Sequence, residues 1–314
     1  MISTMTPYHE ELKLAIEIVN TASKITEWFR EVGFQSYQKE DDSPVTIADY
    51  ATQIYIINKI MEQFPGDQII AEEDDNSFLD HKAKRSINSC YEALNIGENI
   101  NIEKTLMKKD KYSKRQWTVD PIDGTKGYQK GLSYAIGIGF MINSDPKICT
   151  IAVPNYKKFG KAIFIAEKDN GSKFAINNSE FKPINVSPQS QLKQAKMCHS
   201  LHYDEPWVMD FATRAEIANF VQIDSMAKFC MIADGTADLY VKPMNKSRSF
   251  TWDFLPGILL VQEAGGTVTD LQGNSIELQN DKCVVSAPGL IASNSIIHDD
   301  IIEKLKGSEI FNKN

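Results

Sequence analysis

The chain has 314 residues, of which 42% are hydrophobic, 24% charged and 10% aromatic. This length allows one large domain or two fused lobes, and the composition is ordinary for a soluble globular protein. The 34 basic and 42 acidic residues give a formal charge of −8, which argues against a nucleic acid polymer or an anionic membrane as a partner. Nothing in the sequence implies a protein partner. A small polyanion can still bind if metal cations stand between it and the protein.

The cysteines and the N-terminal segment favour a soluble, cytoplasmic protein. No Cys-x-x-Cys pair occurs, so free thiols in a reducing compartment are favoured over disulfides or a zinc site. The first residues lack the basic and apolar regions of a signal peptide, and no apolar run approaches the ~20 residues of a membrane span. The five cysteines are Cys90, Cys149, Cys198, Cys230 and Cys283.

The first third of the chain has a mainly helical pattern. Apolar residues from Leu12 to Phe29 recur at helical spacing, which predicts an amphipathic helix that Gly33 ends. Thr46 opens a second helix that stops before Pro65, and residues 67–74 read as a short buried strand that finishes in acids. A further helix is expected near 80–94. Residues 95–115, rich in Lys and Asn, are interpreted as an insertion or lid.

From residue 115 onward the pattern first becomes β and then alternates. Strands are expected within 115–177, where Asn170-Gly171 is a two-residue hairpin signal. Residues 188–195 resemble a linker. The alternation beyond it predicts an α/β arrangement. Its expected strands and helices lie at 196–200, 206–219, 221–224, from about 225, 237–241, from 253, 266–270 and 283–288.

Acidic residues occur where such folds place functional sites. Asp49 and Asp253 begin helices, whereas Glu72, Asp120 and Asp123 end strands. Strand ends and helix N-termini meet along one edge of a layered α/β fold, so these carboxylates can converge there.

Most of these acids also have a purely structural explanation. Thr46 and Asp49 fit a capping box, and Asp253 can cap its own helix. Glu72 lies in an Glu-Glu-Asp-Asp run that can be solvated surface.

Asp120 and Asp123 are less easily explained as structural residues. Pro121 fixes the backbone between them, so two carboxylates and the Ile122 carbonyl are presented on a stiff segment. Hard cations such as Mg²⁺ prefer oxygen ligands of this type. Gly124 then allows close backbone approach, and the Thr125 hydroxyl could orient an attacking water whose proton Asp49 accepts. An ordinary turn threonine is the alternative.

Two motifs carry a resemblance to a known family. The sequence DPIDGTKGY at 120–128, with WDFLPGILLVQEAGG at 252–266, resembles the signatures of the lithium-sensitive, magnesium-dependent phosphatases related to inositol monophosphatase. SPVTIADYATQ and AEED also match, so the resemblance covers about residues 43 to 290. Within the family, Gly-Thr-Lys-Gly is similar to the 3′(2′),5′-bisphosphate nucleotidases. Inositol monophosphatases typically have Gly-Thr-Thr-Asn there.

The resemblance implies a reaction and a set of site residues. The implied enzyme removes the 3′-phosphate of adenosine 3′,5′-bisphosphate, giving AMP, and also acts on the sulfated analogue PAPS, a nucleotide of sulfur metabolism. It would use roughly two or three Mg²⁺ ions and be inhibited by lithium. Asp49 and Thr125 match the pair that activates the attacking water, and the Gly124 and Thr125 amides would meet the scissile phosphate. The implied metal ligands are Glu72, Asp120, the Ile122 carbonyl, Asp123 and Asp253.

The resemblance also implies a nucleotide-binding set. His199, with His202 as an alternative, matches the histidine near the adenosine. Ser225 and Lys228 match a Ser-x-x-Lys pair that holds the nucleotide and its 5′-phosphate, and Asp253 serves the ribose side. Some nucleotidases have an Arg where this chain has Lys242, and Arg248 could substitute for it; Lys lacks the bidentate fork of Arg.

Competing interpretations are fewer but remain. An inositol monophosphate or polyphosphate 1-phosphatase is the rival in the same class, and a non-catalytic nucleotide sensor is the rival outside it. A zinc site at Cys198, His199 and His202 has poor spacing. The expected fold is the family's layered αβαβα sandwich, an α+β N-terminal lobe over 1–187 followed by an α/β C-terminal lobe over 188–314, with the metals between them.

Overall fold

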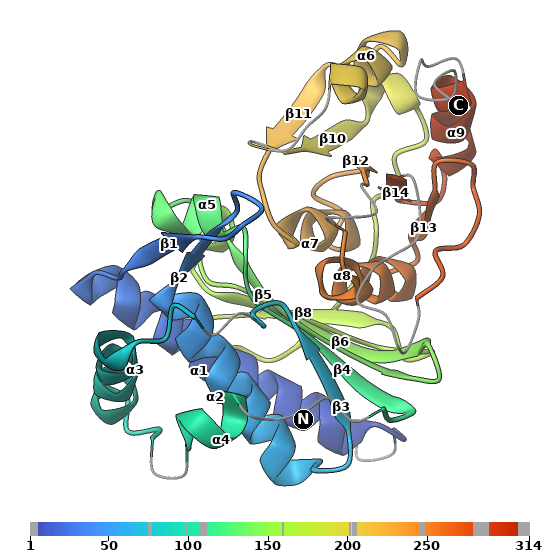
Figure 1. Ribbon diagram of the computed structural model, residues 1–314. Coiled ribbons are helices and arrows are strands. Elements are labelled where there is room, and N and C mark those ends of the chain that lie inside the picture. Colours follow the sequence, from blue (N-terminus) through green and yellow to red (C-terminus); the bar gives the residue numbers. More distant parts are fainter. Residues whose placement is uncertain are drawn as a thin grey trace.

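The computed structural model describes residues 6–74, 77–97, 100–106, 112–158, 160–200, 202, 206–244, 249–278 and 289–306. Helices and sheets alternate in layers (Figure 1). A pair of long helices covers one face of a seven-stranded sheet, two further helices lie between this sheet and a five-stranded sheet, and two more cover the outer face of the latter. The predicted αβαβα sandwich is therefore confirmed.

The first layer forms where the sequence has its strongest helical period. The buried residues of α1 (His9–Val32) fall on one stripe, and Gly33, at a φ of 88°, ends the helix. α2 (Ile47–Gln63) lies against α1, with α3 (His81–Ala93) and α4 (Ile102–Leu106) beside it. The segment interpreted as a lid contains α4, which contacts α2 in this helical layer (Figure 1).

The seven-stranded sheet has the order β3-β4-β5-β6-β7-β8-β9. β3 and β4 run parallel, and each later neighbour is antiparallel, including the β7–β8 hairpin that Asn170-Gly171 predicted. A small two-stranded sheet of β1 (Ser36–Gln38) and β2 (Pro44–Thr46) precedes α2. The strands of the large sheet are β3 (Gln68–Ala71), β4 (Arg115–Asp123), β5 (Ala135–Ile142), β6 (Asp145–Val153), β7 (Ala162–Glu167), β8 (Ser172–Ile176) and β9 (Lys182–Ile184).

The middle layer joins the two sheets. α8 (Thr251–Glu263) contacts β4 to β8 on one side and β13 and β14 on the other, and α7 (Ala227–Ala233) lies beside it. The buried residues of α7 and α8 belong to one apolar cluster that also includes residues from the inner faces of both sheets. α5 (Thr125–Gln129) follows β4 directly and contacts β2.

The five-stranded sheet has the order β11-β10-β12-β14-β13. β10 is parallel to β11 and β12, so their carboxyl ends face one edge, whereas β14 is antiparallel to both its neighbours. α6 (Pro206–Arg214) and α9 (His298–Lys306) cover its outer face. Its strands are β10 (Lys196–His199), β11 (Asn219–Gln222), β12 (Leu239–Pro243), β13 (Thr267–Asp270) and β14 (Gly289–Ser293).

Several expectations differ from the structure in detail. The helix expected over 206–219 ends at Arg214, and the strand expected over 283–288 lies outside the described residues. The connection at 188–195 joins the two sheets and includes a short turn of 3-10 helix, η2 (Leu192–Gln194); a second, η1 (Tyr156–Lys158), follows β6. The lobe boundary at 187/188 stays a prediction. Within the described ranges, no helix combines the length and apolarity that crossing a bilayer requires.

Candidate active site

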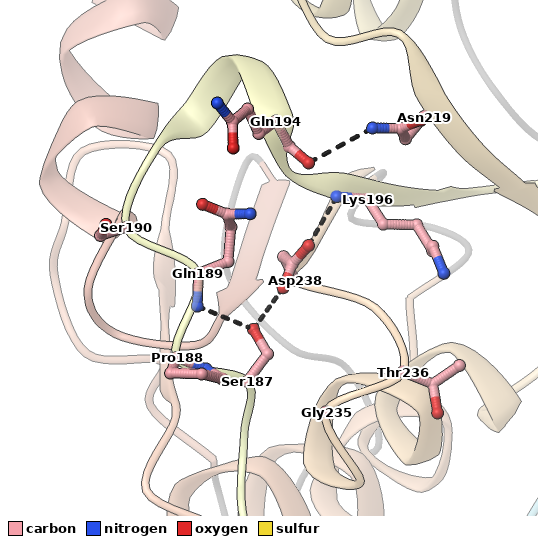
Figure 2. A pocket seen from close by; sticks show the side chains of 10 residues that line it. All are labelled: Ser187, Pro188, Gln189, Ser190, Gln194, Lys196, Asn219, Gly235, Thr236 and Asp238. Carbon is pink, nitrogen blue, oxygen red and sulfur yellow. Dashed lines mark hydrogen bonds between the residues drawn. The ribbon is translucent and has the colours of Figure 1, made fainter.

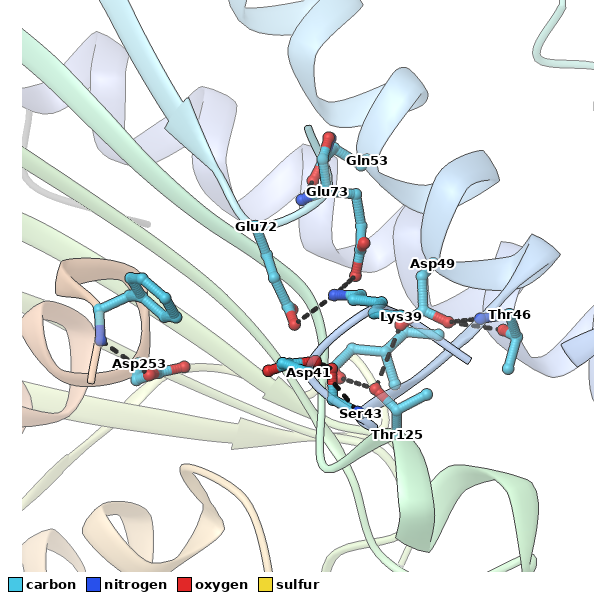
Figure 3. Close-up of polar contacts among 12 residues, drawn as sticks. Lys39, Asp41, Ser43, Thr46, Asp49, Gln53, Glu72, Glu73, Thr125 and Asp253 are labelled. Carbon is cyan, nitrogen blue, oxygen red and sulfur yellow. Dashed lines mark hydrogen bonds and ion pairs between the residues drawn. The ribbon is translucent and has the colours of Figure 1, made fainter. Parts of the chain in front are cut away.

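Acidic side chains from several elements lie beside the carboxyl ends of β3 and β4. Figure 3 shows Asp49, Glu72 and Asp253 among them. Glu72 follows β3, and Asp120 and Asp123 lie at the end of β4, where the strand register shifts. Asp253 projects from the first turn of α8. Because residues 120 and 123 are separated by proline, this strand end cannot complete a regular ladder, and its carboxylates are presented at the sheet edge.

Asp49 makes both of the contacts that its sequence context suggested, one within the cap of α2 and one with Thr125. Its Oδ2 accepts hydrogen bonds from the Thr46 backbone N (2.8 Å) and hydroxyl (2.6 Å), completing the capping box of α2. Its Oδ1 accepts a longer one, 3.3 Å, from the Thr125 hydroxyl. The carboxyl is fully buried, and burial raises its pKa to about 7, with the Thr46 hydrogen bond opposing the shift.

Thr125 stands between Asp49 and the strand end. Its Oγ1 lies 3.1 Å from the Ile122 carbonyl oxygen as well as near Asp49. One hydroxyl proton can serve only one acceptor at a time. The hydroxyl can therefore donate a hydrogen bond to the Asp49 carboxylate or to the Ile122 carbonyl, while its lone pairs accept a hydrogen bond from a third group.

Asp120 is the carboxyl with the least support from the protein. It is 1% exposed, and within the described chain neither of its oxygens has a hydrogen-bond donor. Burial first, and then the charges of Glu72, Asp123 and Asp253, raise its pKa well above the usual range. A buried carboxylate without a partner is unfavourable, so an additional cation would stabilise this position.

Burial likewise raises the pKa of the neighbouring carboxyls. It raises that of Asp253 to about 7, with Lys242 opposing the shift and Asp123 and Glu72 adding to it. It also raises that of Asp123, against the nearby charges of Lys228 and Lys242. The carboxyls influence one another electrostatically, so the structure brings them into one cluster.

One cation in this region is supplied by the chain itself. Lys39, in the turn between β1 and β2, has its Nζ 3.1 Å from Glu72 Oε1 and 2.7 Å from Glu73 Oε1 (Figure 3). Burial alone would lower the pKa of Lys39, but the two carboxylates outweigh it and raise it. Gln53 holds the backbone of Glu73 from α2 through hydrogen bonds of 2.5 and 2.8 Å.

The donor set suits Mg²⁺, although the oxygens are not arranged around an ion. Among the described residues, no three Asp, Glu, His or Cys side chains converge closely enough to hold a metal. Protein donors take some of the oxygens: Asp123 accepts from the Met226 backbone N, Asp253 from the Phe250 N, and Glu72 from Lys39. The unpartnered oxygens of Asp120 and the all-oxygen character of the cluster fit a hard divalent cation.

The predicted nucleotide residues Ser225 and Lys228 lie directly opposite the strand end. A Cβ added to Gly124 would be 3.2 Å from the Ser225 Cβ, and the Met226 N donates to Asp123. Gly124 has a φ of 91°, so its lack of a side chain serves both conformation and close approach. Lys228 is buried; its Nζ donates to the Ile223 carbonyl at 3.1 Å, and burial lowers its pKa.

The remaining nucleotide candidates occupy strand ends of the smaller sheet. His199 ends β10 and contacts the Phe220 ring edge to face, with centroids 5.7 Å apart. Lys242 lies on β12 with its Nζ 4.5 Å from the Phe254 ring centroid. His202 contacts Lys130 and Asp224. Arg248 lies outside the described residues.

Three features of the site were missed by sequence reasoning. Lys39 lies in a polar loop with no pattern to mark it, and the Met226 amide leaves no trace in a sequence. Glu73 follows Glu72 in the acidic run, and only the turn that Gln53 holds directs it inward. Burial, with Glu72 and Asp49 adding to it, raises the pKa of Glu73 to about 9.

A separate polar pocket of about 480 Å³ lies at the opposite end of the small sheet (Figure 2). Lys196 begins β10 and Asp238 precedes β12, so the pocket faces the amino ends of strands whose carboxyl ends face the acids. Asp238 accepts hydrogen bonds from the Ser187 hydroxyl and, at 2.6 Å, from the Lys196 N. The pocket is therefore part of the connection between the sheets and is separate from the acidic cluster.

Comparisons with known proteins assign a class to this layered sandwich, whose carboxylate cluster lies at the ends of β3 and β4. The family model described as the inositol monophosphatase family matches residues 6–309. The chain belongs to this family, so the predicted resemblance is confirmed and the protein is a phosphatase of that class.

Relatives and solved structures cover nearly the whole chain. A 3′(2′),5′-bisphosphate nucleotidase of Emericella nidulans is 29% identical over 95% of this chain and 98% of its own length. One from Schizosaccharomyces pombe is also 29% identical, over 94% and 95%. The IMPase structure from Thermotoga maritima has a TM-score of 0.71 at 21% identity, covering 97% of this chain and 99% of its own.

Proposed function

We propose that the chain is a Mg²⁺-dependent, lithium-sensitive 3′(2′),5′-bisphosphate nucleotidase of the cytoplasm. It would convert adenosine 3′,5′-bisphosphate to AMP and phosphate, and PAPS to adenosine 5′-phosphosulfate. The observation that carries this proposal is the meeting of two sets of residues at one seam. The Asp49–Thr125 pair and the acidic cluster lie on one side, and Ser225 and Lys228 lie on the other. Relatives named as nucleotidases support the choice of substrate.

The metal ligands would be Glu72, Asp120, the Ile122 carbonyl, Asp123 and Asp253. Roughly two or three Mg²⁺ ions bound there would neutralise the phosphates and act as Lewis acids toward phosphate oxygens, which would make the phosphorus more electrophilic. The unpartnered Asp120 oxygens and the mutual repulsion of the carboxyls support this assignment.

The chain's own residues would manage the proton of the attacking water. The Thr125 hydroxyl would accept this proton while donating its own to Asp49 Oδ1, 3.3 Å away. Water oxygen forms a bond to phosphorus as the bond to the 3′-oxygen breaks, and the leaving oxygen takes a proton from solvent. An Asp49 pKa of about 7 is suited to a general base near neutral pH. The Gly124 and Thr125 amides would stabilise charge on the phosphate.

The opposite lobe would hold the rest of the nucleotide. Lys228 and Lys242 place positive charge near Asp123, which suits a second phosphate on the substrate. Ser225 would bind beside Lys228, His199 would contact the adenosine, and Asp253 would reach the ribose. A lysine at 242 gives a point charge in place of an arginine fork.

The proposal is tested by phosphate release from adenosine 3′,5′-bisphosphate with Mg²⁺, with and without millimolar Li⁺. Inositol 1-phosphate, inositol 1,4-bisphosphate and PAPS are assayed in parallel. Lithium-sensitive release that is fastest from the nucleotides supports it. Faster release from an inositol phosphate would favour the inositol phosphatase alternative and overturn the roles of His199, Ser225 and Lys228. A folded protein that binds nucleotide but releases no phosphate would favour the sensor alternative.

A further inference from the structure

A series of hydrogen-bonded polar side chains spans the two lobes next to the proposed nucleotide site. Lys130 is the C-cap of α5, the helix that begins with Thr125, and its Nζ lies 2.9 Å from His202 Nε2. The other ring nitrogen of His202 contacts Asp224 Oδ2. Asp224 Oδ1 accepts a hydrogen bond of 2.6 Å from the Ser200 hydroxyl.

The chemistry of these groups identifies the donor and the acceptor at each contact of the series. The Lys130 ammonium has only donors, so His202 Nε2 is the acceptor of this contact. His202 Nδ1 then carries the proton and donates it to Asp224. The Ser200 hydroxyl, which donates to Asp224, also lies 3.3 Å from the His202 backbone N. The His202 ring is therefore held at both nitrogens.

This series of hydrogen-bonded side chains is buried at its Asp224 and Ser200 end and exposed at its Lys130 end. Asp224 and Ser200 are 5% and 6% exposed, whereas Lys130 is exposed. Ordering a long exposed lysine costs side-chain entropy, which a charge-assisted hydrogen bond to a fixed acceptor can offset. An ordinary surface ion pair joins two flexible side chains, so it contributes less to stability than a lysine bound to a fixed acceptor.

Its position relates it to substrate binding. Ser200 follows His199 at the end of β10, and Asp224 precedes Ser225, whose φ of 74° is unusual for a serine. The Ile223 N donates to the His199 carbonyl at 3.0 Å, which ties these two segments together. The contacts of Asp123 with Met226 and of Gly124 with Ser225 lie along the same seam.

We propose that Lys130, His202, Asp224 and Ser200 form an interlobe clasp that positions His199 and Ser225 for the nucleotide. This inference rests on the proposed nucleotidase function and adds positioning residues to it. Lys130 belongs to the element that carries Thr125, so the clasp fixes the nucleotide-binding segments relative to the attacked phosphate. Without the clasp, fewer molecules would have these segments ordered before substrate binds. The apparent affinity for the nucleotide is proportional to the fraction of molecules in the ordered state, so it would fall.

The test compares Lys130→Met with wild type, using Lys130→Arg as the conservative variant and Lys182→Met as a matched control. Lys182 is an exposed lysine on β9, the edge of the large sheet. Steady-state kinetics with adenosine 3′,5′-bisphosphate and calorimetric binding of AMP are measured for each protein. For Lys130→Met we expect KM and the Kd of AMP to rise about tenfold with kcat within about twofold. Lys130→Arg should recover most of this loss, and Lys182→Met should match wild type.

The fold should survive Lys130→Met, because other contacts join the lobes elsewhere. Lys157 Nζ lies 2.8 Å from Asp234, and Glu263 accepts hydrogen bonds of 3.0 Å from the Asp169 and Gly171 amides. An unchanged melting temperature checks this point. If wild type cleaves the bisphosphate but KM and the AMP Kd of Lys130→Met stay within twofold, the clasp is overturned alone. A loss of kcat at constant KM would overturn it too. A wild-type protein that neither cleaves the bisphosphate nor binds AMP would overturn the nucleotidase proposal as well.

Discussion

Asp49 shows how a single side chain serves both the fold and the proposed chemistry. Capping occupies Oδ2, and the contact with Thr125 uses Oδ1, so the two functions use different atoms. A capping box and a catalytic carboxylate therefore produce the same sequence pattern. The sequence identified the residue and both of its possible functions, and the three-dimensional structure shows that the cap and the Thr125 contact use different oxygens.

This division gives a prediction for Asp49→Asn. Asparagine keeps a capping oxygen but is a very weak base, so kcat should fall about 100- to 10,000-fold while the melting temperature changes little. Phosphate release and thermal unfolding measure the two effects. Asp80→Asn is the control, because Asp80 has only a capping function at a helix start: it is the N-cap of α3 and accepts from the Ala83 N at 2.7 Å. A kcat for Asp49→Asn within tenfold of wild type would leave Asp49 with its capping function alone.

At the scale of elements, the order of helices and strands could be predicted from periodicity and from turn residues. α1, α2 and the β7–β8 hairpin follow from local signals. α9, which packs on the small sheet, is not among the expected helices, although Ile301 and Leu305 have the spacing of one helical face. The contact of α5 with β2 and the position of α8 between two sheets depend on tertiary packing, which local propensity does not encode.

The close approach of α8 to the large sheet makes Gly139 a sensitive position. A Cβ there would lie 2.2 Å from Leu255 Cδ2 and 2.7 Å from Thr118 Oγ1. Gly139→Ala should therefore destabilise the protein by about 1–3 kcal/mol, which the midpoint of urea denaturation measures. Gly66→Ala is the control, since a Cβ at Gly66 meets nothing within 4 Å. Equal midpoints for the two variants would show that the sheet and helix yield without cost.

At the scale of the whole molecule, the site is an unfavourable collection of charge that the rest of the fold holds together. The acids come from segments far apart in the sequence, and they repel one another only when the layers assemble. Assembly also brings the Lys39 ammonium between Glu72 and Glu73. The sequence could predict the acids, because each has a recognisable local context. It could not predict the cation or the clasp, which depend on loops without pattern.

This repulsion predicts a pH-dependent response to metal. Asp49 and Asp253, with pKa values of about 7, and Glu73, at about 9, hold protons more tightly in the folded protein than in the unfolded chain, where their pKa values are 3.8 and 4.5. Their favourable contribution to metal-free stability is complete below about pH 4 and is lost as pH rises toward 9. Of the proposed Mg²⁺ ligands, Asp120, Asp123 and Asp253 all have raised pKa values. Mg²⁺ would bind their deprotonated forms, so its stabilising effect should be larger at about pH 8.5 than at about pH 5.

Thermal unfolding at both pH values, with and without Mg²⁺, measures this response. Asp120→Asn removes one charge from the centre of the cluster. It should raise the metal-free melting temperature at high pH and reduce the shift that Mg²⁺ causes. A Mg²⁺ shift of equal size at the two pH values would contradict the assignment of Asp120, Asp123 and Asp253 as metal ligands.

The position of α8 has a consequence for synthesis on the ribosome. The strands β3 to β9 are complete by Ile184, but the helix that covers their inner face is not made until residues 251–263. A growing chain therefore exposes the apolar side of a nearly finished sheet while more than seventy residues are still to be added. Chains in this state are prone to aggregate, and a chaperone would have its greatest effect then. A fragment of residues 1–187 should accordingly bind a hydrophobic dye and precipitate, and the full chain should do neither.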